Sequence, residues 1–217
     1  LAFFTARSQA RSLQRERDLT NAVAHELKTP LALLRSYAEG LQEDIAPEKH
    51  AEYLDVIMDQ SDQIAALVSS LLDLSRMKAG KTAFTPGPVA LDQVVESVFR
   101  TLERPMETAG VTLDLDLVPC TVSGEEGRLS LVVSNLAANA LKHTPTGGEI
   151  RVILREKGHT SLLRVENDGE PIPEEALPRL FEPFYRSDTA RDRRSGGTGL
   201  GLALVKETVT IHGGACG

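Results

Sequence analysis

The chain has 217 residues, 41% of them hydrophobic and 25% charged, which is the composition of a globular protein long enough to bury a core. Its net charge of −7, with 4% aromatic residues and no Trp, argues against nucleic-acid binding. No apolar run of about 18 residues occurs, and the two cysteines stand far apart in no metal-binding or redox spacing, which favours a reducing compartment.

The first 80 residues predict two long helices. Apolar residues recur three and four positions apart from Ala24 to Ile45 and again from Tyr53 to Leu74, and Ala46-Pro47-Glu48 interrupts the pattern. A narrow apolar stripe on each helix buries little area. We therefore expect a helical hairpin that dimerises into a four-helix bundle, with packing of the hairpin on the rest of the chain as the alternative.

The first of these helices contains His25, followed by Pro30 five residues later. His25 comes directly after Ala24, a position on the apolar stripe, so its ring is expected to point outward or to flank the stripe. Pro30 removes the amide that would bond to the carbonyl of Glu26, and it should kink the helix there. A kink near an outward histidine is a costly feature that hints at function.

Strands and helices alternate after the boundary at Pro86-Gly87-Pro88. The sequence predicts a mixed sheet with helices on one face, an α+β sandwich. The breaker-rich stretch from Asp168 to Gly199 is long for a loop in a compact domain unless it is a functional lid. The predicted helices are Leu91–Ala109, Glu125–Lys142 and Leu200 to about His212, and the predicted strands are Val111–Leu117, Glu149–Glu156 and Ser161–Asn167.

Two short motifs predict polar chemistry. Asn135 and Asn139 lie four residues apart on one helical face, and Lys142 and His143 follow at the helix end. An amide oxygen suits Mg²⁺, although surface asparagines beside a terminal lysine are the plain alternative. Asn167-Asp168-Gly169 ends a strand, where an Asp could accept a hydrogen bond from an exocyclic amine. The same three residues are also a common turn signal.

The glycine-rich segment Gly196–Leu202 runs into a helix and predicts a phosphate site. It lacks the Lys-Ser or Lys-Thr of a P-loop. It also follows a long loop instead of the strand that a dinucleotide-binding fingerprint requires. The catalytic signatures of protein kinases are absent too. The segment therefore indicates phosphate binding outside those three families.

Taken together, five segments resemble the boxes of the sensor histidine kinases of bacterial two-component systems, which belong to the GHKL ATPase superfamily. The segments are in the family's order: His25–Pro30 is similar to the H box, Asn135–His143 to the N box, Asp168-Gly169 to the G1 box, Phe181–Arg186 to the F box and Gly197–Gly201 to the G2 box. The resemblance implies a dimeric four-helix bundle followed by an ATP-binding α/β sandwich of the Bergerat type.

The resemblance also implies roles for single residues. His25 would accept the γ-phosphoryl group of ATP, Glu26 would take or orient its proton, and Arg186 would neutralise charge on the transferred group. Thr29 would serve in dephosphorylating the partner regulator. Asn139 would hold Mg²⁺ with Asn135 beside it, Asp168 would read the adenine amine, and the other cofactor-binding residues would be Lys142, His143, Gly169, Phe181, Gly197, Thr198, Gly199, Leu200 and Gly201.

The domain organisation implied by the resemblance has three parts. Residues 1–19 would be a signalling helix, 20–80 a dimerisation and histidine-phosphotransfer domain, and 81–217 a catalytic ATP-binding domain whose final strands are truncated. We expect a cytoplasmic fragment of a membrane protein, with the membrane span and sensor upstream. The expected partners are a second copy of the chain and the receiver domain of a response regulator.

Two alternatives stay open, and a third fails. The fragment could act mainly as a phosphatase on its regulator, because Glu26 and Thr29 permit both activities. It could be a dimeric scaffold that binds nucleotide without chemistry, although a degenerate scaffold should have lost His25, Asn139 or the glycine loop. An ATP-driven clamp like the gyrase group would carry no H box.

Overall fold

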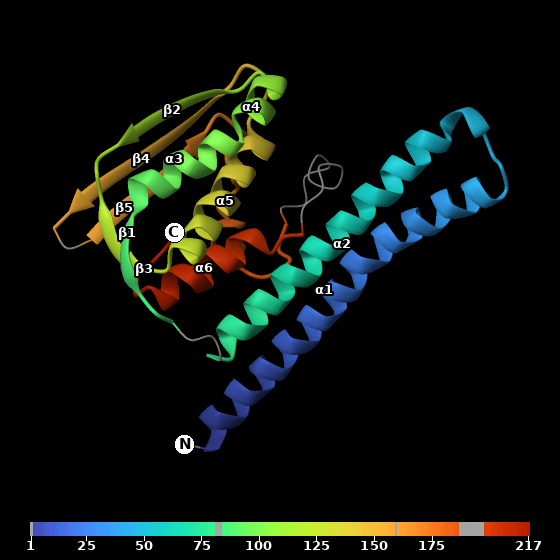
Figure 1. The fold of residues 1–217 in the computed structure, drawn as a ribbon. Coiled ribbons are helices and arrows are strands. Elements are labelled where there is room, and N and C mark those ends of the chain that lie inside the picture. Colours follow the sequence, from blue (N-terminus) through green and yellow to red (C-terminus); the bar gives the residue numbers. More distant parts are fainter. Residues whose placement is uncertain (1, 81–83, 159, 187–197) are drawn as a thin grey trace. The chain divides into compact units, whose positions relative to one another are not determined.

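The computed structural model describes residues 2–80, 84–158, 160–186 and 198–217 (Figure 1). The chain divides into two compact units, Leu1–Leu72 and Asp73–Gly217. Gly197 and the rest of the segment 187–197 lie outside the described residues. None of the helices within the described ranges has the length and apolarity that crossing a membrane requires.

The first unit is a helical hairpin, as the apolar repeat predicts (Figure 1). α1 spans Ala2–Gln42 and stays helical through Pro30, while α2 spans His50–Lys78. The turn between them contains the short 3₁₀ helix η1 (Pro47–Lys49). Near this turn the two helices pack closely, because an added Cβ on Gly40 of α1 would lie 3.1 Å from the ring of Tyr53 on α2.

The apolar stripes of the hairpin are only partly covered. On α1, Leu27, Leu34 and Leu41 are half-buried, whereas Leu31 and Ile45 from the same stripe are 53% and 50% exposed. On α2 the predicted stripe is half-buried or buried, and a second stripe one residue further along is exposed. This second stripe consists of Leu54, Met58, Val68 and Leu72, with exposures from 42% to 65%.

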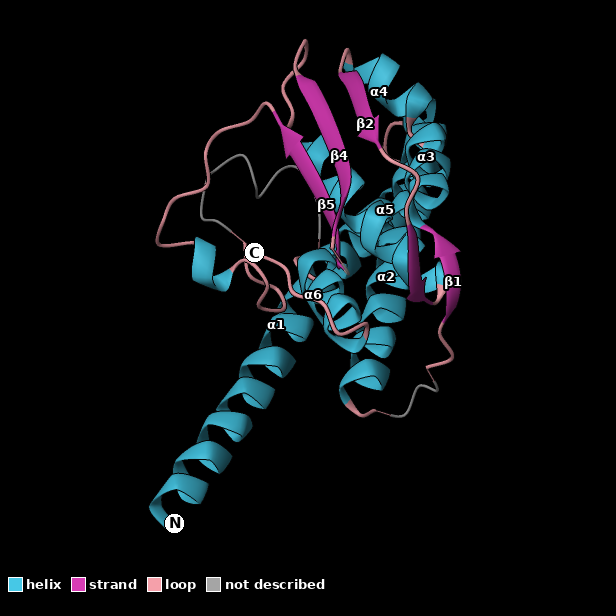
Figure 2. Ribbon diagram, turned by 90° about the vertical axis from the view of Figure 1, so that its left-hand side faces the viewer, coloured by secondary structure: helices cyan, strands magenta, loops and turns pink. Residues whose placement is uncertain are grey.

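The second unit is a two-layer sandwich of a main sheet and a set of helices (Figure 2). Its main sheet has the order β2 (Thr112–Leu117), β4 (Glu149–Lys157), β5 (Thr160–Asn167). β2 and β4 are parallel, and β4 and β5 are antiparallel, so the sheet is mixed as predicted. The inward residues Ile150, Val152 and Leu154 of the central strand are fully buried.

A second, two-stranded sheet was not predicted. β1 (Gly87–Ala90) and β3 (Thr121–Gly124) pair antiparallel. The segment Pro86-Gly87-Pro88 was interpreted only as a boundary, because proline and glycine weaken strands. Pro88 is compatible with β1 because this strand pairs on one side only, so that an amide is not needed on the other side.

The helices of the second unit are α3 (Leu91–Thr101), α4 (Glu103–Ala109), α5 (Glu126–His143) and α6 (Gly201–Ile211), with the 3₁₀ helix η2 (Leu177–Arg179). The prediction of one helix over Leu91–Ala109 is wrong. The helix stops at Thr101 and restarts after Leu102, because Pro105 has no amide to donate to the carbonyl of Thr101. Gly110 ends α4 in the left-handed conformation (φ 66°).

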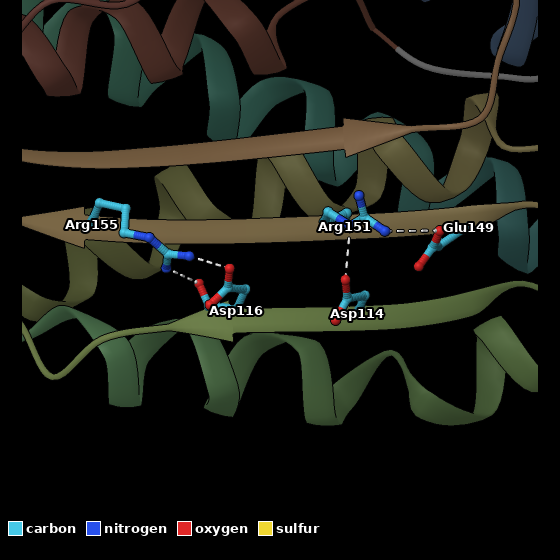
Figure 3. A network of polar contacts seen from close by, with 5 residues as sticks. All are labelled: Asp114, Asp116, Glu149, Arg151 and Arg155. Atoms are coloured by element: carbon cyan, nitrogen blue, oxygen red, sulfur yellow. Dashed lines mark hydrogen bonds and ion pairs between the residues drawn. The ribbon is translucent and has the colours of Figure 1, made fainter.

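In the hydrophobic core between the two layers, one face of α3 packs with the sheet. Leu91, Val94, Val95, Val98 and Phe99 are spaced three and four apart, and all are buried in the core with Ile150, Val152 and Leu154. Charged side chains predominate on the outer face of the sheet. Arg151 donates from Nε to Asp114 Oδ2 at 2.8 Å, and Arg155 pairs with Asp116, so side chains of β4 hold the neighbouring β2 (Figure 3).

Candidate functional site

His25 lies on an open face of α1. Its side chain is 82% exposed, and its Nδ1 lies 3.9 Å from Oε1 of Glu26, which is 28% exposed. An imidazole has two nitrogens, so a carboxylate beside Nδ1 leaves Nε2 available to react. Thr29, one helical turn after His25, is exposed as well. These positions agree with the expectation that His25 points away from the packed stripe.

Two asparagines on α5 have different surroundings. Asn135 is half-buried and donates from Nδ2 to the carbonyl of Leu131 at 2.8 Å. Its Oδ1 faces Gly201 at the start of α6, where an added Cβ would lie only 2.6 Å away. Asn139, one turn further along, is exposed. Asn135 therefore joins α5 to the glycine-rich loop, whereas the side chain of Asn139 is open to solvent.

The end of β5 packs against the end of α5. Asp168 is fixed by two hydrogen bonds with Glu149, because its backbone amide donates to the carbonyl of Glu149 and its Oδ2 accepts from the amide of Glu149, both at 3.0 Å. An added Cβ on Gly169 would lie 2.7 Å from the carbonyl oxygen of His143. Gly169 thus permits the strand end to approach the last turn of α5, beside Lys142 and His143.

The glycine-rich loop is joined to the F-box segment by a backbone contact. The amide of Phe184 donates to the carbonyl of Gly199 at 2.8 Å. Both residues have a left-handed backbone conformation, with φ of 63° for Phe184 and 65° for Gly199. An added Cβ on Gly199 would lie 2.8 Å from Cα of Phe184. A left-handed phenylalanine is unusual and costs about 1–2 kcal/mol, so the surrounding contacts must hold it there.

The remaining predicted residues lie near these contacts. Thr198 Oγ1 accepts a hydrogen bond from the amide of Leu200 at 3.3 Å, just before α6. Leu200 is fully buried, so its side chain packs in the interior just before α6. Phe181 has Nζ of Lys206 5.7 Å from its ring centre, and Arg186 is half-buried.

The second unit therefore brings together residues from four of the five motifs. The N-box helix contacts both glycine segments, through His143 with Gly169 and through Asn135 with Gly201, and the F-box segment contacts the loop through Phe184 with Gly199. His25 belongs to the other unit. The role of Phe184 was missed by sequence reasoning, and no local pattern marks it, because the relevant signal is a backbone angle.

A metal would need ligands other than a carboxylate or histidine cluster. Across the described residues, no group of three or more His, Cys, Asp or Glu side chains could hold a metal ion. Asn139 offers an exposed amide, whose oxygen is a hard donor, one helical turn after Asn135 on α5. A single protein oxygen fits Mg²⁺ that is held mostly by waters and substrate phosphates.

Two family models match the chain. Residues 15–80 match the His Kinase A (phospho-acceptor) domain, and residues 124–216 match the Histidine kinase-, DNA gyrase B-, and HSP90-like ATPase. The probable sensor kinase SilS of Salmonella typhimurium is 34% identical over 207 residues, covering 92% of this chain and 41% of SilS. The signal transduction histidine-protein kinase/phosphatase MprB of Mycolicibacterium smegmatis is 37% identical over 218 residues, covering 96% and 43%.

Solved structures show the same fold. The histidine kinase AdeS of Acinetobacter baumannii has a TM-score of 0.72 at 24% identity and covers 86% of each chain. The histidine kinase ThkA, solved in complex with the response regulator protein TrrA, has a TM-score of 0.75 at 20% identity over 98% of this chain and 60% of that one. The present chain spans less than half the length of the curated relatives SilS and MprB.

Proposed function

Since this chain belongs to the sensor histidine kinases of two-component systems, we propose that it transfers the γ-phosphoryl group of ATP to His25 and passes that group to an aspartate of a response regulator. The observation that carries the proposal is the exposed imidazole of His25 beside Glu26, in a segment that matches the phospho-acceptor model. The matching ATPase model over residues 124–216 supports ATP as the donor.

The chemistry at His25 follows from its two nitrogens. Nε2 attacks the γ-phosphorus in line, a bond forms between nitrogen and phosphorus, and the bond to the bridging oxygen breaks so that ADP leaves. The Nδ1 proton becomes acidic in this step, and Glu26 Oε1, 3.9 Å away, is placed to receive or orient it. The phosphoramidate formed is reactive, which suits onward transfer to a carboxylate.

The residues of the second unit serve to bind and orient ATP in this proposal. Asp168, fixed at the end of β5, accepts from the adenine amine, and the amides at the start of α6 face the triphosphate. Lys142, His143 and Arg186 supply positive charge or hydrogen-bond donors to the phosphates. Asn139 would hold Mg²⁺, and the ion would neutralise charge on the phosphates.

A second copy of the chain is the proposed partner of the hairpin. The exposed stripe of α2 leaves apolar side chains in contact with water, among them Leu54 and Met58 one turn apart. A second hairpin would cover them. The exposed half of the α1 stripe, including Leu31, offers the same kind of surface. Met58→Glu should give a monomer in light scattering, while Asp59→Ala, at the adjacent exposed position, should leave the dimer intact.

Dephosphorylation of the regulator is the second candidate activity. MprB, one of the similar proteins, is a kinase/phosphatase by name. Thr29 lies exposed one turn from His25, where its hydroxyl could orient a water against an aspartyl phosphate. Thr29→Ala should keep labelling of His25 and slow the loss of label from a phosphorylated receiver domain. Equal loss of both activities would argue against a separate role for Thr29.

Labelling with radioactive ATP and Mg²⁺ tests the main proposal. We expect acid-labile, alkali-stable label on the wild-type chain and on His50→Gln, a control at another histidine of the hairpin. The variant His25→Gln should carry no label. Label that persists in His25→Gln would contradict the assignment of the phosphoacceptor. Binding of ATP with no label on the wild-type chain would instead favour a nucleotide-binding scaffold.

A further inference from the structure

The carboxyl end of α6 contacts the chain on both sides of residues 78–83. Thr208 is fully buried, and its Oγ1 lies 3.7 Å from Sδ of Met77 near the end of α2. His212, one turn later, meets the ring of Phe84 edge to face at 4.8 Å between ring centres. Met77 and Phe84 both belong to the second unit. The segment that connects the hairpin to the ATP-binding sandwich is therefore attached at both of its ends to one helix.

The ring of His212 also bridges two helices. Its Nδ1 lies 2.7 Å from the carbonyl oxygen of Thr208, and its Nε2 lies 3.2 Å from the backbone nitrogen of Glu125 at the start of α5. A carbonyl can only accept, so Nδ1 carries the proton, and an amide can only donate, so Nε2 is the acceptor. One tautomer therefore satisfies both bonds, and no side chain that only donates or only accepts could do so.

The start of α5 contacts the same connection. The amide of Thr85 donates to Oε1 of Glu125 at 2.8 Å, and Arg128, which pairs with Glu125, lies with its guanidinium 5.9 Å from the ring centre of Phe84. There is no spare room, because an added Cβ on Gly124 would lie 2.7 Å from the His212 ring. We call Phe84, Thr85, Glu125, Arg128 and His212 the linker anchor.

The helices α5 and α6 pack together, with the linker anchor at one end of the pair and the motif residues expected to bind ATP at the other. The start of α5 meets the end of α6 at His212, and Asn135 further along α5 meets the start of α6 at Gly201, so the two helices run antiparallel. The end of α5 contains the motif residues from Asn139 to His143, and the motif residues from Gly199 to Gly201 lead into α6. The linker anchor is therefore separate from the residues that bind ATP in the proposed function.

We propose that His212 is a positioning residue that docks the connection after α2 onto the start of α5 and the end of α6. This inference rests on the proposed function, because docking sets how far the ATP-binding sandwich can travel to bring the γ-phosphate to His25. His212 touches neither ATP nor His25 in this role. Its loss should slow transfer to His25 without weakening ATP binding.

Two substitutions separate the two hydrogen bonds of the ring. His212→Gln places an amide oxygen near the position of Nε2 and can still accept from Glu125. His212→Asn keeps a donor for the carbonyl of Thr208 but is too short to reach Glu125. At saturating ATP we expect His212→Asn to phosphorylate His25 about fivefold more slowly than wild type, the effect of one lost hydrogen bond, with an unchanged dissociation constant for ATP. His212→Gln should recover most of the rate.

Trypsin provides a readout that does not depend on phosphorylation, because Lys78 ends α2 and Lys81 lies in the connection that follows. Undocking should speed cleavage there in His212→Asn and in Phe84→Ala, but not in Val152→Ala, which weakens the sheet core without touching the linker anchor. Wild-type transfer and cleavage rates in His212→Asn would overturn the proposal, as would a parallel loss of ATP affinity. If the wild-type chain forms no phosphohistidine, the proposed function fails, while cleavage still decides whether His212 docks the connection.

Discussion

Replacing Gly199 by Ala tests whether this glycine is required for its contact with Phe184 as well as for its backbone angle. An added Cβ would lie 2.8 Å from Cα and 2.9 Å from the carbonyl carbon of Phe184. Gly158, in the turn between β4 and β5, has almost the same φ, 64° against 65°, but an added Cβ there would meet nothing within 4 Å. Gly158→Ala is therefore a matched control.

The expected magnitudes follow from these geometries. A left-handed backbone costs a residue with a Cβ about 1–2 kcal/mol, and both variants incur this cost. Only Gly199→Ala must also move backbone carbons out to the ~3.5–4.0 Å of an ordinary contact. That movement stretches the 2.8 Å hydrogen bond from Phe184 to Gly199, whose loss adds about 1 kcal/mol. We expect the free energy of unfolding to fall by about 2–3 kcal/mol in Gly199→Ala and by about 1–2 kcal/mol in Gly158→Ala.

Urea unfolding and titration with a fluorescent ATP analogue measure the two effects. The ATP affinity of Gly199→Ala should fall by about fivefold or more, since about 1 kcal/mol of the cost lies in a segment that orders the glycine-rich loop. The affinity of Gly158→Ala should match that of the wild-type chain. If the two variants lose the same stability and bind ATP equally well, the contact with Phe184 is not the reason for the glycine, and our argument is wrong.

Three further predictions concern the core, the N-box helix and a thiol. Phe99→Ala should lower the free energy of unfolding by about 3–5 kcal/mol, whereas Leu162→Ala, at a 54% exposed position, should change it by less than about 0.5 kcal/mol in the same urea experiment. Gly201→Ala should weaken ATP binding through its clash with Asn135, and adding Asn135→Ala should cost less stability than the two single changes added together. Burial raises the pKa of the Cys216 thiol, so alkylation, which needs the thiolate, should begin at higher pH in the native chain than in urea. As the pH rises from the pKa of the unfolded thiol to that of the native thiol, the free energy of unfolding should fall, because the unfolded chain ionises first.

The sequence predicts most of the fold because its long elements repeat a clear pattern. Each hairpin helix has six or seven apolar positions in its repeat, which identifies it as a helix. Apolar and polar residues alternate on both sides of Gly158, which identifies the two strands. The failures are short elements. β1 and β3 have four residues each, too few for a period to emerge, and β1 contains Pro88. The break between α3 and α4 was missed because Pro105 was not weighed against an otherwise continuous apolar pattern.

The sequence also predicts which residue types form the site, but not how they contact one another. Gly169 was expected to bind the cofactor and Gly199 to approach phosphate, and in the structure each lies against another motif, His143 in the first case and Phe184 in the second. These contacts join residues between 15 and 26 positions apart in the chain, so no local pattern encodes them. The bridge from His212 to Glu125 is still longer in sequence, at 87 residues.

The close contacts bear on how ATP and His25 could meet. Gly169, Gly199 and Gly201 each lie too near a neighbouring motif for even a methyl group, so relative movement among these motifs would break packed contacts. The helix pair α5 and α6 is joined at one end by Asn135 and Gly201 and at the other by His212 and Glu125. Movement of these motifs against one another within the described part of the sandwich is therefore expensive. In the proposed transfer to His25, which belongs to the other unit, we therefore expect the connection after α2 to matter most, and the linker anchor holds its far end at Phe84 and Thr85.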